Sequence, residues 1–400
     1  MRASLGYVLI AAAVFLGWET IKAPLLTRAP QQAVQIGASS PDALGRMAES
    51  QFEARRFEDA NVLAQESLRQ APFNVRALRI LGLVRAREAA RQSEADDLLT
   101  LAGNWSLRDD PAHAWLIERR LRQGDFSSAL AHADTLARRR EELHPRVFNL
   151  FTQAATLDRR ALPPLTALFA RNPPWRGEYL QSLRESPQGD AVMFHMASSL
   201  AGKPGAFSRS ELEVLYKHWL GEGRVKAIQQ IRHRTAPNEA NALANGDFEI
   251  EYAEQALPFG WELGSGPEFS SQIVPDDLDP DHDALRVQVG GDRVNTALDQ
   301  FLLLPPGSYR LKGVYRVEYG EIAGRADWIL RCAESVTPLE VTMSRELSNQ
   351  TKWTAFSATV QIPATGCTGQ HLVLLIQGAE HSSDLAFWID KVQFSTVAGR

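Results

Sequence analysis

The chain has 400 residues, of which 44% are hydrophobic and 23% charged, which is the composition of a folded protein with room for two buried cores. Its formal net charge of -5 supplies no general basic field, and this argues against nucleic acid as a partner. The charge is unevenly placed, because residues 241–290 hold eleven Asp or Glu and a single basic residue, Arg286. Arginine-rich runs between Leu116 and Arg160 are typical of solvated helix faces.

Residues 1–26 carry Arg2 and then no charge until Glu19. This uncharged run lies between the length of a signal-peptide core and that of a membrane-spanning helix. No convincing small-x-small cleavage site follows, since cutting after Ala23 would leave Pro24 at the new terminus. We therefore expect a single-pass signal-anchor with Trp18 at the membrane interface, and cleaved export to the periplasm or medium is the alternative. Either way, the bulk of the chain is exported.

After a polar linker over residues 27–41, apolar positions three and four apart predict helices through residues 42–237. The segments around Phe57 and Phe126 match each other, as do Ala60 and Ala129, at a separation of 69 residues. Ala95 lies between the two alanines, at steps of 35 and 34 residues, which is the length of one helix-turn-helix unit.

These units resemble the tetratricopeptide repeat. The matching positions are Leu44, Met47, Ala48, Ala60 and Pro72 in the first unit, Leu78, Leu81 and Gly82 in the second, and the turn at Gly124 in the third. The match departs from the pattern at Gln51 and Arg85, which stand where an aromatic residue is usual. The resemblance implies an all-α solenoid that docks a protein partner, and a helical spacer is the alternative.

From residue 243 to 397 short alternating runs separated by Gly, Pro and Asn predict strands, and their number favours a two-sheet sandwich. In the run from Tyr309 to Tyr319 every second residue shares one face. The chain is therefore expected to be multidomain, with a helical-repeat domain followed by an all-β domain.

The pieces "NGDFE", "FGW", "PPGSYRL", "WTAFSATVQIP" and "FWIDKVQF" resemble, in order and spacing, carbohydrate-binding modules of the galactose-binding-like jelly-roll fold. The resemblance implies a sugar ligand. It also implies a structural calcium that ties the first strand to the last, with Glu249 and Asp390 at the matching positions. No other cofactor is expected.

Sugar binding in such modules rests on aromatic rings that stack on pyranose faces. Trp261 and Trp388 fall in the recurring motifs and are expected in the core. The better candidates for the binding face are Tyr315, Tyr319, Trp328 and Trp353, and a structural role is the alternative for each, because a long strand buries one of its faces. The acidic run "DDLDPDHD" at 276–283 is not an EF-hand, because His282 stands where the loop needs Gly, and it is expected to be a solvated loop.

Cys332 and Cys367 are the two cysteines of the chain. In an exported protein an even pair favours a disulfide, and two separate buried thiols are the alternative.

No nucleophile elbow, zinc-protease motif or phosphate loop occurs, so no catalytic residue is assigned and a non-enzyme is expected. Together the elements suggest an accessory protein of extracellular polysaccharide production or export, anchored in a bacterial inner membrane. The alternative is a protein-interaction scaffold of the cell envelope that binds no sugar.

Overall fold

The computed structural model describes residues 40–251, 254–319, 324–335, 338–347, 351–378 and 385–397, with the backbone alone over 338–347. The expected membrane anchor at 1–26 lies outside these residues. Within them, every helix is too short or too polar to cross a membrane. Packing divides the chain into two compact units at Val192 and Met193.

Helices occupy the described part of the chain up to Thr235. Their bounds are α3 (Pro41–Glu53), α4 (Phe57–Gln70), α5 (Val75–Arg85), α6 (Gln92–Trp105), α7 (Asp110–Gln123), α8 (Phe126–Ala137), α9 (His144–Leu157), α10 (Leu162–Ala170), α11 (Arg176–Arg184), α12 (Gly189–Leu200), α13 (Arg209–Gly221) and α14 (Val225–Thr235). Single 3₁₀ turns precede α6, α9 and α10.

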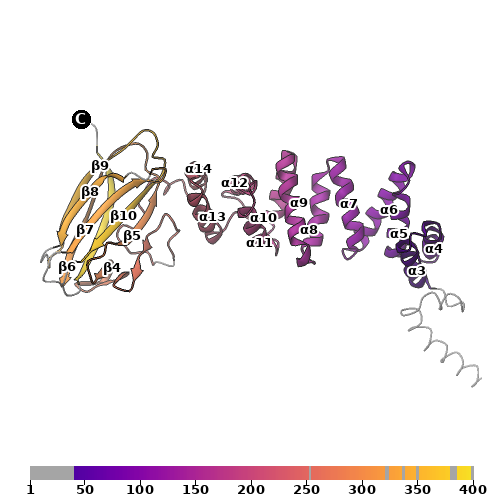
Figure 1. The fold of residues 1–400 in the computed structure, drawn as a ribbon, viewed down its shortest axis with the longest axis horizontal. Coiled ribbons are helices and arrows are strands. Elements are labelled where there is room, and N and C mark those ends of the chain that lie inside the picture. Colours follow the sequence, from indigo (N-terminus) through magenta and orange to yellow (C-terminus); the bar gives the residue numbers. More distant parts are fainter. Residues whose placement is uncertain are drawn as a thin grey trace, which may run out of the picture. The chain divides into compact units, whose positions relative to one another are not determined.

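The helices of the first unit recur as pairs (Figure 1), with α3 against α4, α5 against α6 and α7 against α8. The first helices of successive pairs begin at Pro41, Val75, Asp110 and His144, which are 34, 35 and 34 residues apart. The repeated small residues lie where helices cross closely. A methyl group on Gly82, for example, would lie 2.7 Å from Leu99 Cγ.

Local sequence fixes the ends of these helices. Side chains of Ser40, Asn74, Asp109 and Asp125 accept hydrogen bonds from backbone N–H groups in the first turns of α3, α5, α7 and α8. Gly124 ends α7 with φ of 73°, the left-handed conformation that glycine adopts without strain.

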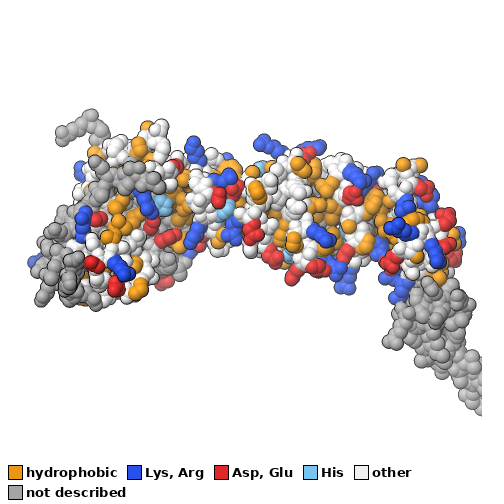
Figure 2. Space-filling view, in the orientation of Figure 1, with side chains coloured by type: hydrophobic (Ala, Val, Ile, Leu, Met, Phe, Trp, Pro, Cys, Tyr) orange, Lys and Arg blue, Asp and Glu red, His pale blue; other side chains and the backbone are white. Residues whose placement is uncertain are grey.

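The polar surface of the helices mixes both signs of charge, as Figure 2 shows on one face. Arg122 pairs with Glu118, and Arg138 pairs with Asp134 at 2.9 Å. The arginine runs therefore belong largely to solvated helix faces, where arginines pair with acidic residues.

Between α7 and α8 the Nδ1 atoms of His113 and His132 lie 3.0 Å apart.

The described strands after Thr235 form an antiparallel β-sandwich (Figure 1). One sheet has the order β1-β5-β10-β7-β8 and the other β2-β3-β4-β11-β6-β9. The strands are β1 (Glu262–Leu263), β2 (Ser265–Gly266), β3 (Phe269–Asp276), β4 (Asp279–Val289), β5 (Asn295–Leu302), β6 (Gly307–Tyr319), β7 (Gly324–Cys332), β8 (Pro338–Leu347), β9 (Thr354–Ile362), β10 (Gln370–Gln377) and β11 (Leu385–Thr396).

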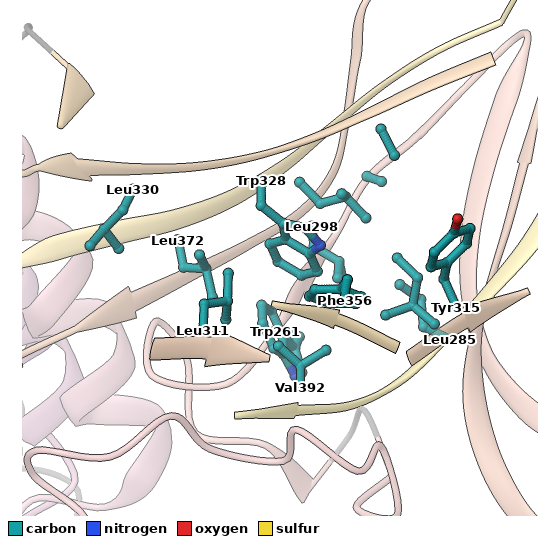
Figure 3. Packing of buried hydrophobic residues seen from close by; sticks show 14 of the residues in the cluster. Trp261, Leu285, Leu298, Leu311, Tyr315, Trp328, Leu330, Phe356, Leu372 and Val392 are labelled. Atoms are coloured by element: carbon teal, nitrogen blue, oxygen red, sulfur yellow. The ribbon is translucent and has the colours of Figure 1, made fainter. Parts of the chain in front are cut away.

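The inner faces of the two sheets enclose one hydrophobic core (Figure 3). Trp261 and Trp328 lie with their ring centroids 6.3 Å apart at its centre, and Tyr315 and Leu285 belong to the same cluster. The alternation predicted for β6 is observed, since Tyr309, Leu311, Tyr315 and Val317 point inward. Arg310, Lys312 and Arg316 of the same strand therefore belong to the outer face.

The second unit also contains the last helix pair, which packs against the sandwich. The ring of Phe259 lies 5.3 Å from that of Tyr216 on α13, and the Arg232 guanidinium of α14 lies 4.4 Å above it. The division by packing therefore differs from the division by secondary structure. A disulfide joins Cys332 to Cys367, the pair that the sequence favours.

Candidate functional site

A cavity of about 350 Å³ opens on the outer side of the six-stranded sheet. Segments far apart in the sequence form its wall: the loop after Asn245, the hairpin between β3 and β4, the residue before β9, and the middle of β11. We call it the Trp353 pocket. Its lining residues are Asp247, Glu249, Asp276, Leu278, Asp279, His282, Asp283, Ala284, Trp353, Asp390 and Lys391.

The "NGDFE" loop places two of the carboxylates. The Asn245 side chain accepts a hydrogen bond from the N–H of Ile250 and donates one to its carbonyl, at 2.9 and 3.0 Å, which closes the loop. Phe248 inserts into the core, where its ring stacks on Trp261 at 5.8 Å. Asp247 and Glu249 flank this buried residue, and both line the pocket.

A β-bulge places two further side chains. Neighbouring residues of a regular strand point to opposite faces, yet Asp390 and Lys391 both line the pocket. The pairing of β11 with β6 shifts register between Asp390 and Gln393, and Lys391 has a φ of 55°. The bulge thus turns both charged side chains to one side and returns Val392 to the core.

The Trp353 ring is partly exposed, and the buried guanidinium of Arg316 packs against it. The Arg316 guanidinium lies 5.3 Å from the centroid of Trp353 and 4.7 Å from that of Trp388, so it contacts both indoles. The Arg316 side chain is 3% exposed and pairs with Asp276 at 2.6 Å and with Asp277. Burial lowers the pKa of Arg316, and the Asp276 carboxylate opposes this. The hairpin that carries Asp276 is thereby fastened over β6.

A hydrogen bond to Glu318 also fixes Trp388. One Glu318 oxygen accepts hydrogen bonds from Trp388 Nε1 and from Arg286 Nε, both at 2.8 Å. The bond from Arg286 lowers the pKa of Glu318. Trp388 is 3% exposed, so it supports the sheet face and offers no open ring. The sequence motif placed Trp388 in the core. The structure buries it on the outer face instead, between two arginines.

The pocket is strongly acidic. Burial raises the pKa of Asp390; Lys391 opposes this, and the nearby Glu249 and Asp247 carboxylates raise it further. His282 Nδ1 lies 3.0 Å from a Glu249 oxygen, and this hydrogen bond raises the pKa of the imidazole. Carboxylates thus outnumber the basic groups that face them.

The aromatic residues predicted for the binding face have different positions. Trp353 lines the pocket, whereas Tyr319 is 39% exposed at the end of β6 and does not line it. Tyr315 and Trp328 are corrections to the prediction. They are 6% and 1% exposed in the core between the sheets, because the inward faces of β6 and β7 bury them, so neither ring can stack on a sugar.

The predicted calcium pair lies together, since Glu249 and Asp390 line the same pocket although 141 positions separate them. Among the side chains that the structure describes, no three His, Cys, Asp or Glu converge closely enough to hold a metal ion. The tie between the first segment and the last strand is instead seen in the backbone, where Val392 N–H donates to Gly246 O at 2.7 Å.

Sequence reasoning missed the part played by Arg316 and by the acidic hairpin. Alternation in β6 places Arg316 on the face opposite Tyr315, but it does not show that the 276–283 hairpin folds over that face. The residues predicted as a solvated loop therefore include Asp276, which is 6% exposed and bonded to Arg316.

No protein-family model matches the chain, and no curated protein sequence matches it. Solved structures that are similar to it include carbohydrate-binding modules. TmCBM61, solved in complex with beta-1,4-galactotriose, is 15% identical, with 39% of this chain and 99% of that chain covered and a TM-score of 0.28. The CBM22-1 xylan-binding domain of Paenibacillus barcinonensis Xyn10C is 12% identical, with 40% of this chain and 97% of that chain covered and a TM-score of 0.31. A family 16 carbohydrate-binding module is 16% identical, with 39% of this chain and 99% of that chain covered and a TM-score of 0.27.

Proposed function

We propose that the sandwich is a carbohydrate-binding domain that holds a sugar ring against Trp353. The observation that carries the proposal is the Trp353 pocket itself: a partly exposed indole, fixed by Arg316, forms a wall of a cavity of about 350 Å³ rich in hydrogen-bond acceptors. An apolar ring face beside a few convergent polar groups is the usual composition of a small-ligand site. Sugars present an apolar C–H face and a rim of hydroxyl donors, which match these two features.

Isothermal titration of the full-length chain with a panel of oligosaccharides tests the proposal. Trp353→Ala is expected to weaken binding roughly thirtyfold, which is the effect of truncating an aromatic anchor worth about 2 kcal/mol. Trp105→Ala is the matched control, because Trp105 is 56% exposed on the helical unit, far from this pocket in the sequence. Equal binding by the two variants would contradict the assignment. The proposed role is binding, so bound glycan is expected to be recovered chemically unchanged.

We also propose that the helix pairs form a tetratricopeptide-like solenoid that docks a protein partner. A second cavity, of about 380 Å³, lies among α7, α8 and α9 and is lined mainly by apolar side chains that include Phe126, Leu150 and Leu157. Leu157 is 85% exposed there. A photo-crosslinking residue at position 157 is expected to give a discrete adduct with one envelope protein, and Leu150→Asp should abolish it. A crosslinker at Leu107, which is 61% exposed elsewhere, is the control.

The setting that unites the two roles is a membrane-anchored accessory factor in exopolysaccharide production or export, with the bulk of the chain in the periplasm. In that setting the solenoid grips the machinery and the sandwich contacts the glycan. Protease accessibility of the sandwich in spheroplasts, but not in intact cells, would support the location. Protection in both would oppose it.

A further inference from the structure

The charge around the Trp353 pocket restricts the class of ligand further than the aromatic wall alone does. Six lining residues carry carboxylates, and the basic lining residues are Lys391 and His282. Lys391 is 71% exposed and lies 3.7 Å from Asp390, and His282 is 65% exposed against Glu249. Water screens such exposed partners, so they neutralise the carboxylates poorly.

The size and the aromatic wall of the pocket, and not its charge, define the site. A volume of about 350 Å³ is within the range of small-molecule sites, which begins at about 300 Å³. It is far larger than a calcium ion with ligands at about 2.3–2.6 Å requires. The face of the Trp353 ring adds an apolar surface, with which a bare ion makes no favourable contact. The carboxylates then select among ligands that fill this space.

The cation that supports Trp353 has one buried donor without a partner among the described residues. Arg316 Nε is buried and makes no hydrogen bond within the described part of the chain, although the side chain is more than nine-tenths buried. Its guanidinium contacts Asp276 and Trp353, both of which line the pocket. Arg316 itself does not line the pocket, so this N–H belongs to the buried support of the Trp353 wall and is not offered to a ligand.

We propose that the Trp353 pocket binds a sugar that carries a free amino group, with its ammonium beside Asp390 on the acidic side of the pocket, which Asp247 and Glu249 also line, and its ring on Trp353. This inference rests on the proposed glycan-binding function and adds the class of sugar. Ionised carboxylates only accept hydrogen bonds, and an ammonium offers three donors with a positive charge. An N-acetyl group removes that charge, a hydroxyl supplies none, and a uronic acid adds repulsion.

A series of β-1,4-linked hexasaccharides that differ only at carbon 2 tests the inference with the full-length chain at pH 6. Its members are the glucosamine, N-acetylglucosamine and glucose hexamers, and hexagalacturonate is the anionic comparison. The glucosamine hexamer is expected to bind at least tenfold more tightly than the other members, as one or more charge-assisted hydrogen bonds imply. Asp390→Asn should remove most of this preference, and Trp353→Ala should weaken every sugar. Asp292→Asn, an exposed acid outside the pocket, should change neither.

The outcomes separate this inference from the function on which it rests. Binding of a neutral or acidic sugar that is lost in Trp353→Ala, without preference for the amine, would overturn the inference and leave the proposed function standing. Absence of binding by all these sugars would overturn both. Equal binding of spermidine and the glucosamine hexamer, unaffected by Trp353→Ala, would show an unspecific acidic surface. Binding of calcium alone, without any sugar, would also overturn the inference.

Discussion

Replacing Arg316 by Leu tests the framework that holds Trp353 in place. The side chain of Arg316 is 3% exposed and the side chain of its partner Asp276 is 8% exposed, so the change leaves a buried carboxylate without its cation. Removing one partner of a buried ion pair costs about 3–5 kcal/mol. The contacts with Trp353 and Trp388 are lost as well. Arg316→Lys keeps the charge but loses the planar group between the two indoles, so its cost should be smaller.

Denaturant unfolding of the full-length chain measures this cost. Both cysteines of the protein lie in the sandwich, so the transition that dithiothreitol shifts identifies that domain. Arg310→Leu is the matched control, because Arg310 lies on the same strand and face but is exposed, and a cost within about 0.5 kcal/mol is expected. If Arg316→Leu costs no more than Arg310→Leu, the buried bridge does not support the pocket.

Three further predictions concern the stability of the two units. Reduction of the Cys332–Cys367 disulfide, which spans 35 residues, should cost the sandwich roughly 4 kcal/mol in the chain-entropy model and leave the helical unit unchanged in calorimetry. Gly246→Ala should lower the sandwich melting temperature, since the new Cβ would lie 1.8 Å from a main-chain oxygen of β11, whereas Gly177→Ala, with open space around it, should not. Burial, reinforced by the neighbouring His113, lowers the pKa of His132 from 6.5 to about 4, so the unfolded chain binds a proton between these pH values that the folded chain does not. The unfolding free energy of the helical unit should therefore fall as pH drops from 6.5 to 4, and His132→Gln should flatten that slope; an unchanged slope would refute this reading.

The sequence predicts those parts of the fold that local periodicity and turn chemistry determine. The helix pairs, the turn at Gly124 and the alternation of β6 follow from residues close together in the chain. The burial of Trp261 follows from a motif. Exposure of an aromatic residue is harder to predict, because Tyr315 and Trp328 lie on alternating strands whose buried face depends on the opposite sheet.

The candidate site depends on contacts between distant segments, and the sequence shows these only in part. Glu249 and Asp390 could be paired through the resemblance to carbohydrate-binding modules. The hairpin that carries Asp276 lines the same pocket, and the ion pair between Asp276 and Arg316 holds it against the outer face of the sheet. No local sequence pattern predicts that ion pair. Trp388 is buried for the same reason, since Arg286 and Arg316 cover the outer face around it.

In the proposed function a sugar contacts the Trp353 ring. The most direct measurement is fluorine NMR of the full-length chain labelled with 5-fluorotryptophan, with the Trp353 resonance assigned from Trp353→Phe. Titration with the glucosamine hexamer, and with the neutral hexamers in turn, is predicted to shift the Trp353 resonance and to leave those of the buried Trp261 and Trp328 in place. Saturable binding that leaves the Trp353 resonance unmoved, or no binding at all, would contradict the claim.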